Sequence, residues 1–171
     1  MPRPDAVTTR FTGRYLRVDE ESWPGLPAYE VVHQLGAAAI LPITPSGDAL
    51  LVRQFRPPVG DDLLEIPAGL LDVDGEDAMT CAVRELREET GFGADAVEFL
   101  GGVFVSPGSS DHYVHLFRAR TASRAGGSPE PGIEVVPTPF DQLVAAASAG
   151  RIRDAKTALA VLMAAARPPL P

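Results

Sequence analysis

Three glutamates within two helical turns are the residues of this sequence best suited to chemistry. The segment CAVRELREETGF, residues 81–92, contains Glu85, Glu88 and Glu89. If the segment is helical, spacings of three and four residues place these carboxylates on neighbouring parts of one face. Like charges so placed oppose helix formation by roughly 0.2–0.5 kcal/mol per pair. Either this face is solvated and paired with arginines, or a strongly positive group binds against it.

A fourth carboxylate, Glu76, precedes the segment, so a loop and a helix could present four oxygen ligands together. Oxygen ligands without a Cys/His set favour a hard cation such as Mg²⁺ or Mn²⁺ over zinc. Such sites commonly recruit substrate phosphates as further ligands, which suggests metal-assisted attack on a phosphate. Arg84, four residues before Glu88, is placed to steer a carboxylate. The alternative is an ordinary solvated helix rich in Glu and Arg.

The composition fits one soluble globular protein of 171 residues, with 45% hydrophobic and 22% charged residues. The net charge is −8 and no long Lys/Arg cluster occurs, which disfavours a nucleic-acid binder. Metal ions can still bridge an acidic protein to a phosphorylated ligand.

Cysteine usage and the lack of targeting segments predict a cytoplasmic location. Cys81 is the single cysteine, which fits a reducing compartment and predicts a small buried helix residue. The N-terminus has no apolar signal core, and no apolar run reaches membrane-spanning length. We therefore expect no membrane partner.

Strand-like and helix-like segments are interleaved, with enough hairpins to predict a mixed sheet of the α/β (α+β) class. Residues 1–35 predict an N-terminal β unit, with one strand over 8–18, and residues 36–171 a second domain. The expected elements in the second domain are a hairpin of 36–43 and 48–55, a short strand in 62–71, a helix over 77–90 stopped by Gly91, strands around the loop SPGSSD, a mobile loop over 121–132, a strand at 133–137, and helices over 140–149 and 154–166, the last with Asp154 as N-cap.

The carboxylate segment resembles the Nudix box, G-x5-E-x7-R-E-U-x-E-E-x-G-U, where U is a bulky aliphatic or aromatic residue. The matching positions are Glu76, Arg84, Glu85, Leu86, Glu88, Glu89, Gly91 and Phe92. One departure precedes them: six residues, not five, separate Gly69 from Glu76, which we interpret as a one-residue insertion in the loop. The resemblance implies a Nudix-like α/β/α sandwich with a mixed central sheet.

In that family the carboxylates matching Glu85 and Glu89 bind metal, and Glu88 is a further ligand or a catalytic group. The backbone carbonyl at the position of Ala68 often ligates as well. The resemblance gives Glu76 and Arg84 the task of orienting this set.

Further segments resemble the ADP-ribose pyrophosphatase branch, from about residue 30 to the end of the chain. They are GAAAILPI, LLVRQFRPPVG, LLEIPAG and RIRDAKTALAVLMA, together with Pro107, sixteen residues after Gly91. This resemblance implies Mg²⁺- or Mn²⁺-dependent hydrolysis of ADP-ribose to AMP and ribose 5-phosphate. It also implies a homodimer in which the N-terminal β unit is the dimerisation element.

The residues outside the box offer candidate contacts to this substrate. Arg56 could bind phosphate in a bidentate way, and Glu65 could accept a sugar hydroxyl. The loop at Pro107, Gly108 and Ser109 supplies hydroxyl and backbone groups suited to a sugar. The alternatives are that Arg56 is an ordinary surface residue, that Glu65 only ends a strand, and that the loop is only a tight turn.

The general base is expected in the acidic loop after the box strands, where Glu130 is the first candidate and Glu134 the second. An exposed Glu130 without a role is the alternative. Two other functions stay open: hydrolysis of another nucleoside diphosphate derivative (a nucleotide sugar, a dinucleotide or an oxidised nucleotide), and a non-catalytic nucleotide sensor.

Overall fold

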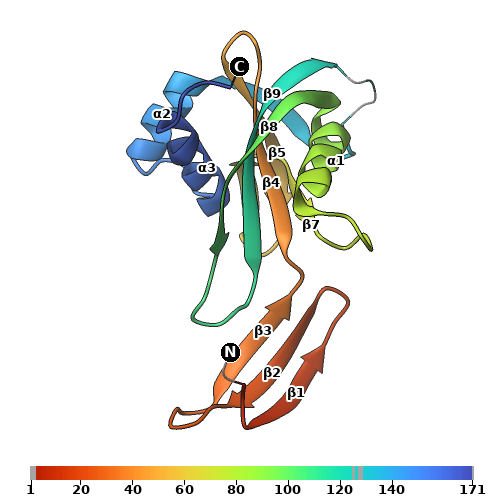
Figure 1. Cartoon of the computed structure of the whole chain (residues 1–171), viewed down its shortest axis with the longest axis vertical. Coiled ribbons are helices and arrows are strands. Elements are labelled where there is room, and N and C mark those ends of the chain that lie inside the picture. Colours follow the sequence, from red (N-terminus) through yellow and green to blue (C-terminus); the bar gives the residue numbers. More distant parts are fainter. Residues whose placement is uncertain (1–2, 125, 127–128, 171) are drawn as a thin grey trace.

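The chain folds into two β-sheets with helices packed on the larger one (Figure 1). A computed structural model describes residues 3–124, 126 and 129–170. The strands are β1 Ala6–Thr12, β2 Leu16–Ser22, β3 Tyr29–Gln34, β4 Ala37–Ile43, β5 Asp48–Arg56, β6 Asp61–Glu65, β7 Ala68–Leu70, β8 Phe92–Phe104, β9 Tyr113–Arg124 and β10 Glu134–Pro139, and the helices are α1 Ala78–Thr90, α2 Phe140–Ser148 and α3 Ala155–Ala165. Within these described ranges, each helix is too short or too polar to cross a bilayer.

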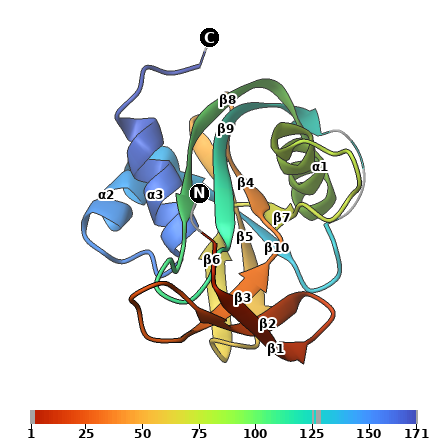
Figure 2. The same ribbon diagram turned by 60° about the horizontal axis from the view of Figure 1, so that its bottom comes forward.

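The larger sheet has seven strands in the order β10-β5-β4-β9-β8, with β6 paired to β5 and β7 paired to β4. β4 and β9 run parallel, and β4 also pairs antiparallel with β7, so the sheet is mixed. Helix α1 covers one face, and α2 and α3 cover the other (Figures 1 and 2). This arrangement is the α/β/α sandwich that the sequence predicted.

Strand β4 forms the centre of the molecule because both of its faces are buried. Ala37, Ala39 and Leu41 point into the cluster that α2 and α3 close, while Ala38 and Ile40 point into the cluster that α1 closes. Side chains alternate along a strand, so a run without polar residues can serve two cores at once. The small alanines let the helix layers pack close to the sheet on each side.

The N-terminal sheet differs from its prediction. A single interrupted strand was expected over 8–18, but β1 and β2 form an antiparallel hairpin that turns at Gly13. The Gly13 N–H donates to the Leu16 carbonyl oxygen over 2.9 Å, which closes the turn. The alternation of polar and apolar residues continues through this turn, so the pattern alone does not reveal it. β3 completes this sheet, which lies beneath the open end of the larger one (Figure 1).

The other predicted elements are largely confirmed. β4 and β5 form the expected hairpin around residues 44–47, and Asp154 is the N-cap of α3, accepting from the Thr157 N–H over 2.9 Å. The loop predicted over 121–132 begins later, because β9 continues to Arg124. Part of that prediction, at residues 125, 127 and 128, lies outside the described residues.

Candidate active site

Helix α1 holds the box glutamates in a fixed register. Asp77 caps its first turn by accepting from the Thr80 N–H over 2.8 Å, and Gly91 ends it in the left-handed conformation with φ of 76°. Cys81 and Leu86 are fully buried in the core on this side of the sheet. Because that side of α1 is buried, the partly exposed Glu85 and the exposed Glu88 lie on the side of the helix away from the core.

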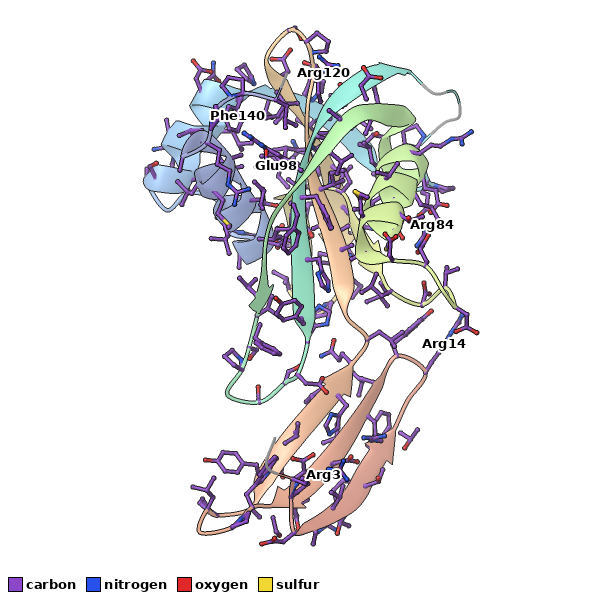
Figure 3. All side chains as sticks on the ribbon, in the orientation of Figure 1. Arg3, Arg14, Arg84, Glu98, Arg120 and Phe140 are labelled. Carbon is purple, nitrogen blue, oxygen red and sulfur yellow. The ribbon has the colours of Figure 1, made fainter. Side chains whose placement is uncertain are left out.

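Arg84, which Figure 3 labels on α1, contacts two carboxylates of α1 and one of the preceding loop. Its Nε and Nη2 donate to the two oxygens of Glu76 over 2.9 and 3.0 Å, a bidentate pair. Its Nη1 donates to Glu85 over 2.7 Å and to Glu88 over 2.9 Å. These contacts raise the pKa of Arg84, chiefly through Glu76, and Arg84 lowers the pKa of Glu76. The guanidinium therefore fixes the relative positions of Glu76, Glu85 and Glu88.

Glu89 is the buried carboxylate of the set, with a side chain near α1's C-terminal end that reaches back to β7. Its Oε2 accepts from the Ala68 N–H over 3.2 Å, and the residue is 6% exposed. Burial raises the pKa of Glu89 to about 8, and the charges of Glu85 and Glu130 add to the effect. Burial likewise raises the pKa of Glu85 against the opposing influence of Arg84. Both groups lack enough positive charge around them to offset the cost of burying an ionised carboxylate.

Strand β7 approaches Glu85 very closely at Gly69. A β-carbon added to Gly69 would lie 1.9 Å from the Glu85 Oε1 atom. Atoms cannot come that near, so any other residue at position 69 would displace the Glu85 carboxylate. The glycine that opens the box pattern is therefore needed for space, and the six-residue spacing to Glu76 still lets Arg84 reach Glu76.

These residues fit a divalent cation. Glu89 has no salt-bridge partner among the described residues, and Arg84 occupies the position of a cation between Glu85 and Glu88. The one group of three metal-ligand side chains within 4.8 Å in the described ranges lies elsewhere, at Asp19, Glu21 and His33.

Arg56 and Glu65 form a pair next to this site. The Arg56 Nε and Nη2 atoms donate to the two Glu65 oxygens over 2.7 and 3.0 Å, and Glu65 is 2% exposed. The charge of Glu89 also acts on Arg56, which places the guanidinium near the α1 carboxylates. Lys156 from α3 contacts Glu65 as well, and is itself held by Asp154 over 3.0 Å. Both oxygens of Glu65 are therefore engaged within the protein.

Lys156 is a contact that sequence reasoning missed. It lies 91 residues from Glu65 along the chain, and only the folded sheet brings α3 beside β6. A lysine two residues after the helix N-cap is an ordinary pattern, so the sequence contained no sign of this pairing. His33 and Asp111, which pair over 2.7 Å, were missed for the same reason.

The two candidate bases differ in their surroundings. Glu130 is exposed, and its charge raises the pKa of both Glu85 and Glu89, so it faces the α1 carboxylates. Glu134 lies on β10 opposite Arg53 of β5 and pairs with it over 3.0 Å. Glu130 thus acts electrostatically on the α1 carboxylates, whereas Glu134 is paired with Arg53 on the sheet.

The loop containing Pro107, Gly108 and Ser109 lies against the N-terminal sheet. The Val32 N–H of β3 donates to the Ser109 carbonyl oxygen over 2.8 Å, and the Asp111 N–H donates back to the Val32 carbonyl oxygen over 3.3 Å. The loop is therefore attached to β3, at the open end of the larger sheet (Figure 1).

Comparison with known proteins identifies the family. A sequence model of the NUDIX domain matches residues 32–159. The chain belongs to the Nudix family. It is a Nudix pyrophosphohydrolase, and Nudix hydrolases generally use divalent metal ions.

Three relatives of this chain carry different functional names. The chain is 35% identical over 159 residues to a methanol dehydrogenase activator of Bacillus methanolicus, covering 88% of this chain and 85% of that protein. It is 35% identical to an ADP-ribose pyrophosphatase of Bacillus subtilis, covering 77% and 73%. It is 38% identical to a GDP-mannose pyrophosphatase of Yersinia enterocolitica, covering 71% and 69%.

A solved structure supports the Nudix fold independently. The crystal structure of an ADP compounds hydrolase superimposes with a TM-score of 0.82 at 23% identity, covering 96% of this chain and 92% of that one. At this identity the likeness concerns the fold. It extends over nearly the whole chain, the N-terminal sheet included.

Proposed function

We propose that this Nudix enzyme hydrolyses the pyrophosphate of ADP-ribose to AMP and ribose 5-phosphate, with Mg²⁺ or Mn²⁺ bound at α1. The observation that carries the proposal is the buried Glu89 carboxylate beside the partly buried Glu85 carboxylate, on a helix whose register matches the Nudix box. The similarity to the Bacillus subtilis ADP-ribose pyrophosphatase supports the choice of substrate.

Glu85, Glu88 and Glu89 would hold the ions, together with the backbone carbonyl of Ala68. A bound divalent ion neutralises pyrophosphate charge and lowers the pKa of a coordinated water. Arg84 positions Glu85 and Glu88 through its Nη1 contacts, and its bidentate pair with Glu76 keeps the guanidinium in place.

Glu130 is our candidate general base. The water oxygen forms a bond to one phosphorus, the bond from that phosphorus to the bridging oxygen breaks, and the water proton passes to the Glu130 carboxylate. Attack at either phosphorus gives the same two products. The exposure of Glu130 and its electrostatic effect on Glu85 and Glu89 support this choice over Glu134.

Arg56 would bind a substrate phosphate through Nη1, because Nε and Nη2 are already used by Glu65. In this arrangement Glu65 orients Arg56 and does not bind sugar itself. The loop of Pro107, Gly108 and Ser109 remains our candidate sugar contact, through its hydroxyl and backbone groups.

The decisive experiment is incubation with ADP-ribose and Mg²⁺, with separation of the products and an EDTA control. We expect AMP and ribose 5-phosphate in equal amounts. Glu89→Gln should lower turnover by orders of magnitude in a folded protein, and Glu130→Gln by about 10²–10⁴-fold. Glu134→Gln is the matched control from the same segment and should keep most activity. Full activity in Glu89→Gln would remove Glu89 from the metal site.

GDP-mannose is the second candidate substrate, favoured by the Yersinia relative. A substrate panel at equal concentrations distinguishes the two, since GDP-mannose would give GMP and mannose 1-phosphate. A higher kcat/KM for GDP-mannose would overturn the ADP-ribose assignment and leave the metal site intact.

We also propose that residues 1–35 form a dimerisation unit and that the enzyme is a cytoplasmic homodimer. Exposed apolar side chains on the N-terminal unit support an interface there; they are Val7, Phe11, Tyr15, Leu16, Leu26, Tyr29 and Leu35. Cys81 is a free, buried thiol, which is consistent with a reducing compartment.

A further inference from the structure

The N-terminal sheet gathers three metal-binding side chains on one face, far from the Nudix helix in the fold. Asp19 and Glu21 are two residues apart on β2, so they point to the same side, and His33 lies on β3 opposite Arg17. One ligand atom from each of the three residues lies within 4.8 Å of the other two. Nothing in the Nudix reaction uses this group.

The separations match the edges of a tetrahedral metal site. The His33 Nε2 atom lies 3.4 Å from the Asp19 Oδ2 atom and 3.2 Å from the Glu21 Oε1 atom. Ligands held about 2.0–2.1 Å from a tetrahedral ion are about 3.3–3.4 Å apart. The contact between His33 and Glu21 is also within hydrogen-bond range, so these separations fit a shared ion as well as a direct hydrogen bond.

Each of the three side chains also forms a hydrogen bond with a residue outside the group. Asp111 Oδ2 lies 2.7 Å from His33 Nδ1, which leaves Nε2 facing the two carboxylates. The Trp23 Nε1–H donates to Glu21 Oε2 over 2.9 Å, and the Arg17 Nε–H donates to Asp19 Oδ2 over 2.9 Å. Metal-binding histidines commonly hydrogen-bond a carboxylate through their second ring nitrogen, and metal-binding carboxylates commonly accept hydrogen bonds; these contacts orient the ligands.

An unsatisfied oxygen gives a second, independent observation. Asp19 is 1% exposed, and its Oδ1 atom has no hydrogen-bond partner in the described structure. A buried carboxylate oxygen without a partner is costly, so it usually indicates a missing water or ion. Asp19 Oδ2, the oxygen 3.4 Å from the His33 Nε2 atom, also accepts from Arg17, and Oδ1 of the same carboxylate is left without a partner inside the protein.

We propose that Asp19, Glu21 and His33 bind one divalent transition-metal ion of the zinc type, with water as the fourth ligand. One imidazole and two carboxylates suit such an ion, whereas the all-carboxylate set on α1 suits Mg²⁺ or Mn²⁺. Asp111 belongs to the loop beside Ser109, so the ion would fasten that loop to the N-terminal sheet. The proposal does not depend on the substrate of the enzyme.

Trp23 provides a direct probe, because it is the single tryptophan of the chain and contacts Glu21. The full-length protein is titrated with Zn²⁺ in excess Mg²⁺, while tryptophan fluorescence and the zinc bound at dialysis equilibrium are measured. We expect a saturable fluorescence change with one zinc per chain. Glu89→Gln should leave this response unchanged, since the ion binds away from α1.

We expect Glu21→Gln and His33→Gln each to weaken zinc binding by on the order of 100-fold or more. Removing only a hydrogen-bond partner of a metal ligand already lowers metal affinity by about 10–100-fold. Glu21→Gln keeps an acceptor for Trp23, so it tests the ligand without removing that contact. Glu20→Gln, from the adjacent position facing the other side of β2, is the matched control. Circular dichroism checks folding. Unchanged fluorescence on zinc addition, or equal zinc affinity in Glu21→Gln, would show that the group is only an ion-pair cluster and overturn the proposal.

Discussion

At the scale of single residues, Glu89 combines two properties that rarely occur together in a carboxylate. It is nearly inaccessible to solvent, and its nearest polar contact is a backbone N–H and not a cation. Without a metal, ionising such a group opposes folding. With a metal, the same burial strengthens the attraction between ion and carboxylate, because the local dielectric constant is low.

Glu89 should therefore make the metal-free protein lose stability as the pH rises. The folded-state pKa of about 8 exceeds the usual 4.5, so the folded chain binds the proton more tightly than the unfolded chain. The free energy of unfolding should fall between about pH 4.5 and pH 8, by up to about 1.4 kcal/mol per pH unit. Thermal melting in EDTA across this range measures the slope.

Glu89→Gln should flatten this slope and raise the melting temperature of the metal-free protein at pH 8. Glu88→Gln, which leaves Glu89 in place, serves as the control and should keep the slope. An identical slope in wild type and Glu89→Gln would mean that Glu89 is already ionised in the folded state at low pH.

Single-residue roles were partly predictable from the sequence. Helical spacing predicted that Arg84 would reach Glu88, and the two lie 2.9 Å apart. The contact between Arg84 and Glu76 was not predicted, although the box pattern gave both residues an orienting role. The pairing of Lys156 with Glu65 was not predictable, because side chains 91 residues apart meet only through the packing of α3 on the sheet.

At the scale of elements, strand β7 packs closely against α1 where Gly69 meets the Glu85 side chain. Gly69→Ala should push the Glu85 carboxylate away, since the added carbon would lie 1.9 Å from its Oε1 atom. The end of a glutamate can rotate, so we expect a change in unfolding free energy of about 1 kcal/mol or less and a much larger loss of Mn²⁺ affinity. Isothermal titration with Mn²⁺ measures the affinity.

Gly108→Ala is the matched control for this experiment, because a carbon added there meets no atom within 4 Å. It should bind Mn²⁺ like the wild type. If Gly69→Ala also kept wild-type affinity, the position of Glu85 in the structure would not be the one that binds metal.

Helix α3 stabilises the strand that precedes the active-site loop through Lys156. Lys156→Met leaves the buried Glu65 carboxylate with Arg56 alone, so we expect the free energy of unfolding to fall by about 1–3 kcal/mol. Arg153→Met is the control, since its pair with Asp61 is exposed to solvent and should contribute much less to the free energy of unfolding. Urea unfolding of both variants measures the difference, and equal losses would contradict a special role for Lys156.

Element boundaries show where sequence patterns were sufficient. The ends of α1 and α3 were predicted because capping residues act locally, within one turn. The β1–β2 hairpin was missed because its turn at Gly13 interrupts neither hydropathy nor alternation. The β4–β5 hairpin was predicted from its turn sequence, whereas the parallel β4–β9 pairing is set by packing across the whole sheet and was not predicted.

At the scale of the whole molecule, the N-terminal sheet leaves many apolar side chains exposed to solvent and not packed in a core. Phe11 is 55% exposed on β1, and we expect it to lie in the proposed dimer interface. Phe11→Ser should shift the mass measured by light scattering from dimer toward monomer. Met79→Ser, which removes an equally exposed apolar side chain from α1, should leave the mass unchanged. A monomeric wild type would exclude the interface altogether.

The contact between Arg84 and the glutamates of α1 has a consequence for how the enzyme responds to its surroundings. Since the guanidinium neutralises part of this acidic face when no ion is present, we expect the chain to fold without a divalent metal, in contrast to a zinc finger. A divalent ion that binds Glu85 and Glu88 must compete with the Arg84 guanidinium for their oxygens. Occupancy should consequently follow the free magnesium concentration of the cell, so that catalytic rate rises and falls with that supply.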